Sequence, residues 1–236
     1  MTNGKRIAVI GSGSWATAIV KILCNNANKI SWFCRNQDYI DFIKQYTHNP
    51  RYLSSVNFDL NKLELSSDLL KTIQTADIII LAVPSAFIND TLKELPKTIF
   101  DNKVVFSAIK GIVPEYNLIV GEYLNTVYKV PFENIGVITG PCHAEEVALE
   151  KLSYLTLAAS EIKHADELCE YMRCRYIKCS SSDDIYGTEL SAVLKNVIAV
   201  AGGICHGLGY GDNFLSVLVS NAIQEIDRFV AAVHPI

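Results

Sequence analysis

The sequence has little of what small disulfide-rich or metal-stabilised proteins depend on. Its 236 residues contain seven cysteines, an odd number, and no two of them stand as C-x-x-C. The spaced trio Cys169, Cys174 and Cys179 has no histidine nearby at ligand spacing, so we expect free thiols and no metal. Free thiols are typical of a reducing compartment, and we therefore expect a cytoplasmic protein.

Strong charge and long apolar runs are also absent. The formal net charge of -4 gives no reason to expect a nucleic-acid or membrane-surface partner, although a local basic pocket could still bind a phosphorylated small molecule. The first residues, MTNGKRIAVIGSGSW, lead into a glycine loop and do not resemble a signal peptide. No stretch approaches the roughly 18 uninterrupted apolar residues of a membrane span, so we expect no membrane insertion.

What the sequence does contain is an alternation of short apolar strands and amphipathic helices. Near-continuous apolar strands such as IIILAV suit a parallel sheet covered on both faces, and the alternation predicts a doubly wound, Rossmann-type α/β fold. A further strand, helix and strand at residues 154–159, 163–172 and 176–179 would extend the sheet. The main strands are expected at residues 6–10, 30–34, 77–83, 104–108 and 135–139, and helices at residues 16–24, 37–46, 66–75 and 86–95.

The pattern changes after residue 184. Residues 188–206 and 213–233 are predicted helices that are apolar nearly all round, which is typical of helices buried in a bundle. We therefore divide the chain into a dinucleotide-binding domain, residues 1–184, and the start of an all-α substrate domain, residues 185–236. Two such helices without partners would expose apolar faces, so we expect a homodimer or self-association through them.

A glycine-rich turn follows the first predicted strand. Gly11, Gly13 and Ala16 form a G-x-G-x-x-A pattern that opens a helix. Gly11 permits the tight turn, Gly13 lets the backbone approach a pyrophosphate, and Ala16 lets helix and strand pack closely. The helix N-terminus presents free N–H groups and the positive end of its dipole to the phosphates. A purely structural turn is the alternative, but the position of the pattern favours a dinucleotide site.

The second predicted strand ends at Phe33-Cys34-Arg35-Asn36, without the Asp or Glu that usually binds the ribose diol of NAD. Arg35 either pairs with a 2′-phosphate, stacks on adenine, or is a solvated residue at a strand end. We therefore favour NADP as the cofactor, with NAD as the alternative.

Two later strand ends carry side chains of chemical interest. Lys110 follows the strand at residues 104–108 and either contacts a ligand or lies on the surface. Gly140 can expose backbone N–H groups, and Cys142 precedes a helix N-terminus, which lowers a thiol pKa. A nucleophilic Cys142–His143 pair is nevertheless disfavoured, because adjacent side chains rarely reach attack geometry and hydride transfer needs no nucleophile.

Lys195 and Asn196 lie in the middle of the apolar helix predicted at residues 188–206. A lysine there either extends to water or lines a polar cavity. In a cavity, desolvation would lower its pKa from about 10.4 and make it a usable proton donor or acceptor.

Together these segments resemble the NAD(P)-dependent glycerol-3-phosphate dehydrogenase family. The resemblance spans nearly the whole chain, and its last segment is long and highly specific. It implies the reversible reduction of dihydroxyacetone phosphate to sn-glycerol 3-phosphate, which supplies glycerophospholipid synthesis. The matching segments are GSGSWATA, ISWFCRN, NPRYLSSV, ADIIILAVPSAF, SAIKGI, ITGPCHAEEVA and GTELSAVLKNVIAVAGGICHGLGYGDN.

The resemblance also implies roles for individual residues. Lys195 would be the general acid in reduction and the base in oxidation, since a nearby ammonium can stabilise and protonate a developing alkoxide. The residues bordering the substrate would be Lys110, Gly140, Cys142 and Asn196. The cofactor would be contacted by Gly11, Gly13, Ser14, Trp15, Arg35, Lys110 and Ala144.

The sequence departs from the family pattern at three positions. Ala16 stands where Gly is frequent, Cys142 where Ser or Thr is common, and Asn221 where many members have Arg. Family members also continue further, with segments that bind the substrate phosphate, so we expect that the chain is truncated. The competing interpretations are another two-domain dehydrogenase, such as a β-hydroxyacid or ketopantoate-type reductase, and a cofactor-binding fragment without activity.

Overall fold

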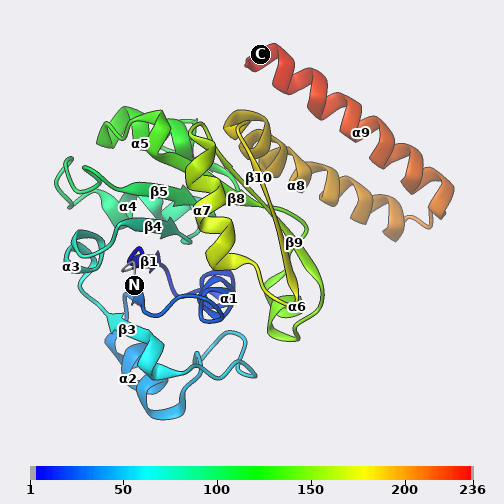
Figure 1. Cartoon of the computed structure of the whole chain (residues 1–236). Coiled ribbons are helices and arrows are strands. Elements are labelled where there is room, and N and C mark those ends of the chain that lie inside the picture. The colour runs from blue at the N-terminus through cyan, green and yellow to red at the C-terminus, as the bar shows by residue number, and fades with distance from the viewer. Residues whose placement is uncertain (1–3, 235–236) are drawn as a thin grey trace.

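The computed structural model describes residues 4–234, which are built around an eight-stranded sheet with helices on both faces (Figure 1). The strands lie in the order β10-β9-β8-β5-β4-β1-β2-β3. The six strands from β8 to β3 are parallel, in the doubly wound order, whereas β9 pairs antiparallel with β8. Their bounds are β1 (Ile7–Ile10), β2 (Ile30–Phe33), β3 (Leu63–Ser66), β4 (Ile78–Leu81), β5 (Val104–Ser107), β8 (Ile135–Thr139), β9 (Ser153–Ala159) and β10 (Ile177–Ser182).

Helices α1, α2, α6 and α7 cover one face of the sheet, and α3, α4 and α5 cover the other. A small antiparallel hairpin, β6 (Ile112–Val113) and β7 (Leu118–Ile119), follows β5. The helices are α1 (Ser14–Leu23), α2 (Gln37–Tyr46), α3 (Leu69–Gln74), α4 (Ile88–Leu92), α5 (Val120–Tyr128), α6 (Ala144–Ala148), α7 (Ile162–Met172), α8 (Ile185–Gly207) and α9 (Asp212–Val233).

Strand β1 shows why the central strands are apolar throughout. Ile7 and Val9 pack into the core beside α1, while Ala8 and Ile10 pack into the core on the opposite face. All four residues are at most 1% exposed. Because successive side chains of a strand point to opposite faces, a strand covered on both sides needs an apolar residue at every position.

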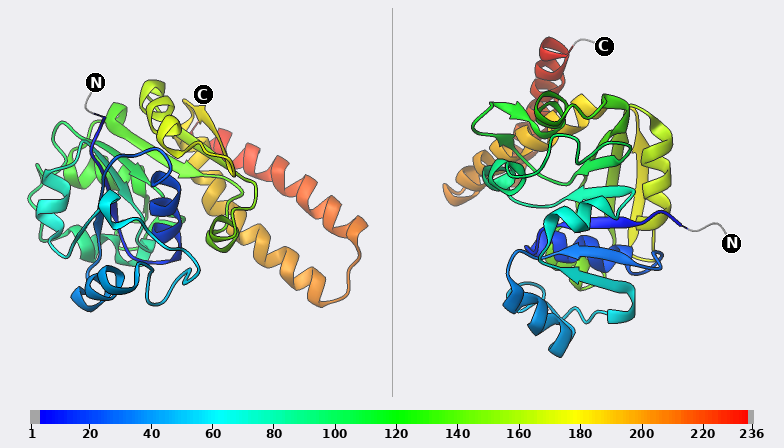
Figure 2. Two further views of the ribbon diagram at one scale, coloured as in Figure 1. Left: turned by 60° about the horizontal axis from the view of Figure 1, so that its bottom comes forward. Right: turned by 90° about the vertical axis from the view of Figure 1, so that its left-hand side faces the viewer.

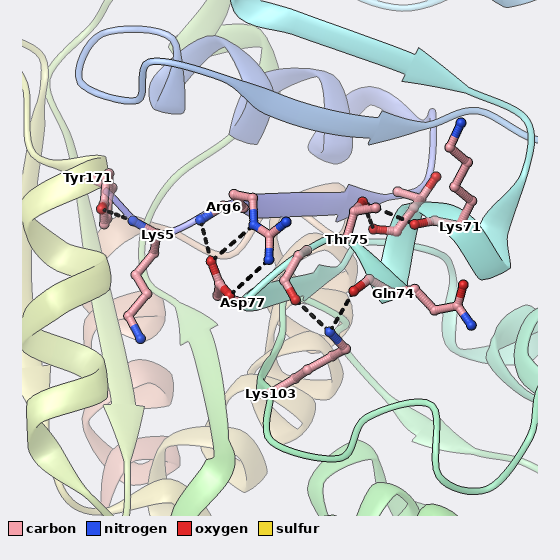
Figure 3. Close-up of polar contacts among 10 residues, drawn as sticks. Lys5, Arg6, Lys71, Gln74, Thr75, Asp77, Lys103 and Tyr171 are labelled. Atoms are coloured by element: carbon pink, nitrogen blue, oxygen red, sulfur yellow. Dashed lines mark hydrogen bonds and ion pairs between the residues drawn. The ribbon is translucent and has the colours of Figure 1, made fainter. Parts of the chain in front are cut away.

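Polar contacts close the edge of the sheet where the parallel strands begin (Figure 3). Arg6 precedes β1, and its backbone N–H donates to the carboxylate of Asp77, which precedes β4, at 2.9 Å. Lys103, just before β5, donates to the backbone carbonyl oxygens of Gln74 at 3.1 Å and Ala76 at 2.6 Å. These contacts join the starts of β1, β4 and β5. The opposite, carboxyl edge is where doubly wound sheets bind ligands.

The predicted doubly wound fold is confirmed, with differences at particular elements. The helix predicted at residues 66–75 begins at Leu69, because Asp68 caps it: its carboxylate accepts from the Lys71 N–H at 2.9 Å. The sequence pattern predicts no strand at β3, a short edge strand with only one buried residue, Leu63. The predicted extension of the sheet is present, but β9 reverses direction there.

Helices α8 and α9 form a hairpin that extends away from the sheet (Figures 1 and 2). As expected for two apolar helices without partners, α8 is exposed over most of its length, although its composition is typical of a helix buried in a bundle. Val200 and Ile204, for example, are 64% and 58% exposed. A helix that is apolar all round needs neighbours on every side. Within residues 4–234, the second half of α8 has α9 as its neighbour. The buried residues of α8 all lie in its first half, and they are Ile185, Gly187, Glu189 and Ala192.

Among the described helices, α8 is also long and apolar enough to cross a membrane by length and composition alone. One such helix is weak evidence of a membrane span. Lys195 and Asn196 stand in the middle of the helix, so its apolar stretch is interrupted, as the sequence indicates.

Gly136 in β8 gives a direct test of packing between neighbouring strands. A Cβ atom at this position would lie 2.3 Å from Cε1 of Phe106 in β5, much closer than two carbon atoms approach without repulsion. We expect Gly136→Ala to lower the free energy of unfolding by about 1–3 kcal/mol, the usual cost of overpacking a core. Chemical denaturation measures this change.

Gly203→Ala in α8 is the matched control, because no heavy atom lies within 4 Å of a Cβ atom built there. It should leave stability unchanged or raise it by up to about 1 kcal/mol, the difference in helix propensity between the two residues. An unfolding free energy of Gly136→Ala equal to the wild type would mean that Phe106 moves aside without cost.

Candidate functional site

Two adjoining cavities lie at the carboxyl edge of the parallel strands. The larger has a volume of about 680 Å³ and the smaller about 340 Å³. Gly13 and residues 82–84 line both cavities. The two therefore form one continuous groove across the ends of β1 and β4, where the doubly wound fold predicts a ligand.

The glycine turn between β1 and α1 has no room for a side chain at Gly11. Gly11 has a φ of +128°, and a Cβ atom there would lie 2.4 Å from the carbonyl oxygen of Ala82. The indole N–H of Trp32 donates to the Gly11 carbonyl at 2.7 Å and fixes the turn. Gly13 is the N-cap of α1 and offers no side-chain cap, so the first N–H groups of α1, starting at Ser14, are available to an anionic ligand.

A buried asparagine joins this turn to the loop after α2. The Asn49 amide donates to the Ser12 carbonyl at 3.0 Å and to Thr17 Oγ1 at 2.9 Å. Its amide oxygen accepts from the backbone N–H groups of Arg51 at 2.9 Å and Tyr52 at 3.1 Å. Every donor and acceptor of the Asn49 amide is therefore used. The sequence analysis missed this residue, although an Asn that binds the backbone two residues on is a recognisable turn signal.

Arg35 stands two residues after the end of β2 and lines the larger cavity together with Arg51, Tyr39 and Tyr52. The Arg51 guanidinium lies over the ring of Tyr39, 5.3 Å from its centroid. The sequence analysis named Arg35 as the cation at this place, but Arg51, from the loop that Asn49 binds, is a second cation in the same cavity. Asp90 is the one carboxylate in the described lining, so the cavity keeps a net positive charge.

Lys110 and Trp15 line the smaller cavity. The Lys110 ammonium lies 5.9 Å from the centroid of the Trp15 ring. Burial lowers the pKa of Lys110, and the nearby ammonium of Lys195 lowers it further. The Trp15 indole N–H is buried and has no hydrogen-bond partner. An unpaired buried donor is costly, so this N–H fits an acceptor atom on a bound ligand.

Cys142 also lines the smaller cavity and is 2% exposed. Burial raises the pKa of its thiol to about 11, and this effect outweighs the opposing influence of Ser153 and Lys110. The thiol is protonated at neutral pH, which agrees with setting aside a nucleophilic Cys142–His143 pair. Gly140, two residues before Cys142, has a φ of +125°, and a Cβ atom there would lie 2.4 Å from the Tyr154 carbonyl oxygen.

Lys195 and Asn196 do not line either cavity. Both are exposed on α8, just beyond the buried Ala192. Lys195 nevertheless lies close enough to Lys110 for its charge to lower the pKa of that side chain. The structure therefore places Lys195 outside the lining of the smaller cavity, on an element that begins in the core and continues outside it.

The groove gathers most of the predicted site residues from four separate chain segments. Those lining it are Gly11, Gly13, Ser14, Trp15, Arg35, Lys110, Cys142 and Ala144, and those outside its lining are Gly140, Lys195 and Asn196. Their functional roles stay predictions. The lining residues that the sequence analysis did not single out include Tyr39, Arg51, Tyr52, Ser85 and Asp90.

Comparison with known proteins adds independent information. The family model for the NAD-dependent glycerol-3-phosphate dehydrogenase N-terminus matches residues 6–165, and the model for the C-terminus of the same family matches residues 184–235. The crystal structure of a glycerol-3-phosphate dehydrogenase from Coxiella burnetii superposes with a TM-score of 0.86 at 27% identity, covering 98% of this chain and 70% of that chain.

Two curated relatives are named glycerol-3-phosphate dehydrogenase (NAD(P)+). The protein of Oceanobacillus iheyensis is 32% identical over 225 residues, which cover 95% of this chain and 64% of the relative. The protein of an Exiguobacterium species is 34% identical over 223 residues, which cover 94% of this chain and 65% of the relative. The chain thus spans about two thirds of the length of these relatives. On these matches, the chain belongs to the NAD-dependent glycerol-3-phosphate dehydrogenase family.

Proposed function

We propose that this chain belongs to an oxidoreductase that reversibly reduces dihydroxyacetone phosphate to sn-glycerol 3-phosphate. The observation that carries the proposal is the convergence of three donors at one cavity, in a chain of a dehydrogenase family. These are the free N–H groups of α1, the unpaired indole N–H of Trp15 and the ammonium of Lys110. The product would supply glycerophospholipid synthesis in the cytoplasm.

We propose that the two predicted domains have separate functions: residues 1–184 bind the cofactor, and residues 185–236 begin the substrate domain. The N–H groups after Gly13 would hold the pyrophosphate. Arg35 and Arg51 would lie at the adenosine end, since both line the larger cavity. Two guanidinium groups, without a carboxylate directly after β2, favour NADP over NAD. When bound, the nicotinamide supplies the hydride in reduction and accepts it in oxidation.

The substrate would lie in the smaller cavity, beside Lys110 and Cys142. When a hydride reaches the carbonyl carbon, negative charge develops on the carbonyl oxygen. Lys195, with Asn196 beside it, would deliver a proton to that oxygen, and the neutral amine would take a proton from the alcohol in the reverse direction. Two ammonium groups that repel one another, Lys110 and Lys195, suit a substrate with a doubly charged phosphate.

A cofactor-binding chain with little turnover is the second candidate. Among the described residues, Lys110 is the one lysine or arginine that lines the smaller cavity. A phosphate dianion is commonly held by a bidentate arginine or by several donors, and this binding energy positions the reacting carbonyl. One lysine in the lining, with Lys195 beside it, provides only part of such a site.

The role of Arg35 is tested by Arg35→Asp. Removing its charge-assisted contact with a 2′-phosphate should weaken NADPH binding by about 1.5–3 kcal/mol. NADH, which lacks that phosphate, should lose much less. Fluorescence titration of both cofactors measures the two effects. Lys44→Asp makes the same change of charge at an exposed position outside both cavities and should not alter the ratio. Equal weakening of both cofactors by Arg35→Asp would rule out the role.

Lys195→Met tests the proton carrier in a form of the protein that turns over dihydroxyacetone phosphate. The substitution keeps an unbranched apolar side chain but removes the ammonium, so the turnover number should fall by about 10²–10⁴-fold. Cofactor affinity should hardly change, because the glycine turn is untouched. Lys163→Met, an exposed lysine outside both cavities, is the control. Turnover within a few-fold of the wild type would assign proton transfer to another residue.

The 236-residue polypeptide itself distinguishes the two candidates. We expect it to bind NADPH through the glycine turn and Arg35, but to oxidise NADPH with dihydroxyacetone phosphate very slowly. The exposed apolar faces of α8 and α9 should also cause self-association or a dimer, since large apolar patches recruit another surface. Turnover assays and light scattering measure both. A soluble monomer with turnover near that of its relatives would contradict both expectations.

A further inference from the structure

Glu189 is the one charged residue that is buried among residues 4–234, with an exposed fraction of 2%. It lies in the first part of α8. Its Oε1 accepts from the backbone N–H of Val120 at 3.0 Å, and its Oε2 accepts from the backbone N–H of Gly121 at 3.3 Å. The ion pairs of the described residues do not include it. The two backbone N–H groups are therefore its polar partners.

Val120 and Gly121 are the first two residues of α5, a helix whose N-cap residue, Ile119, offers no side-chain cap. The first N–H groups of a helix have no partner inside the helix. Glu189 supplies the missing acceptors from another helix, and uses both carboxylate oxygens to do so. The approach depends on the glycine, because a Cβ atom at position 121 would lie 3.1 Å from Oε2. The contact thus joins α8 to α5.

Short chain segments connect this contact to both lysines, Lys110 and Lys195. From Lys110 at the end of β5, the chain passes through the β6–β7 hairpin directly to Val120. On α8, Lys195 comes six residues after Glu189, which corresponds to about 9 Å along the helix axis. Beyond Ala192 the side chains of α8 become largely exposed. The buried first turns therefore fix the direction in which α8 leaves the core.

We propose that Glu189 is a positioning residue for the proposed reaction, and that its carboxylate, by capping α5, fixes where α8 holds Lys195 relative to Lys110. The anchoring itself does not depend on the proposed function. Only its consequence for turnover rests on that function, because it requires Lys195 to carry the proton.

The ionisation of Glu189 gives the anchor a pH dependence. Burial raises the pKa of Glu189 to about 7, Glu122 on α5 raises it as well, and the two N–H groups oppose these effects. Tyr186 on α8 also faces this carboxylate, and the ring of His234 stacks on Tyr186 with centroids 3.9 Å apart. Because the pKa is raised in the folded state, the folded protein holds this proton more tightly than the unfolded chain does.

Stability that depends on this proton is present below pH 4.5, the ordinary carboxyl pKa, and is lost as the pH rises through about 7. The stability of the wild type relative to Glu189→Gln should therefore fall between pH 4.5 and 8. Denaturation of both proteins over this range measures the difference. A difference that is constant with pH would show that Glu189 is not held in the buried, uncharged form.

Amide hydrogen exchange of this chain tests the anchor directly. In Glu189→Gln one carboxylate oxygen becomes an NH₂ group, which faces a backbone N–H donor and cannot accept from it. Protection of the Val120 or Gly121 amide should fall about tenfold or more, as expected when a buried donor is left without an acceptor. Glu122→Gln removes a carboxylate from the same turn of α5 without touching these bonds, and should leave their protection nearly unchanged.

The pKa of Lys110 tests positioning as distinct from mere stability. It can be measured by NMR on ¹³C-methylated lysines in the wild type, Glu189→Gln, Lys195→Met and the double variant. Lys195→Met should raise the pKa of Lys110 by removing the neighbouring charge. Glu189→Gln should also raise it, by letting Lys195 move away, although direct loss of a carboxylate would lower it. The double variant should show no further rise.

Each outcome of this cycle decides between the alternatives. A lower Lys110 pKa in Glu189→Gln, or the same rise with and without Lys195, would overturn the positioning role. Gly121→Ala disturbs the same contact from the other side and should reproduce the rise, which covers the case that Glu189→Gln fails to fold. If the cycle behaves as expected but Lys195→Met leaves turnover intact, the anchor stands and the proposed proton carrier is wrong.

Discussion

The absence of a side chain at Gly11 is the constraint on which the groove depends. Because the backbone there can approach the Ala82 carbonyl so closely, the end of β1 and the end of β4 lie side by side, and α1 starts directly above them. The N–H groups of α1 then point into the space that residues 82–84 and Lys110 enclose. A methyl group at this one position would separate all of these parts.

Two buried polar residues then join two further segments of the site to this frame. Asn49 joins the loop that carries Arg51 to the glycine turn, and Glu189 joins the helix that carries Lys195 to α5. Both side chains lie away from the groove lining and bind backbone groups from distant segments. Buried polar groups must be paired, so each of them permits few alternative placements of the segment that it holds.

Sequence patterns predicted those features of the fold and of the site that are determined by residues close together in the sequence. The strand periodicity of β1 and β4, the glycine turn and the position of Lys110 at a strand end all follow from short segments of sequence. The roles of Asn49 and Arg51 could not be predicted in this way, because they depend on the loop after α2 packing against the glycine turn, which is distant in the sequence. The apolar composition of α8 indicates a helix that needs neighbours on every side, and the exposed apolar faces of α8 follow from that composition.

The reversal of β9 has a consequence for which end of α8 reaches the groove. In the parallel strands the chain leaves the sheet at the carboxyl edge, but β9 and β10 run the other way, so β10 ends at the opposite edge. Helix α8 starts at that edge, and to reach the carboxyl edge it must run along the length of the strands, which is about 16 Å for the five residues of β8. Lys195 comes ten residues after Ile185, which corresponds to a rise of about 15 Å in a helix. The direction of two strands therefore selects the middle of α8, and not its beginning, to stand beside Lys110.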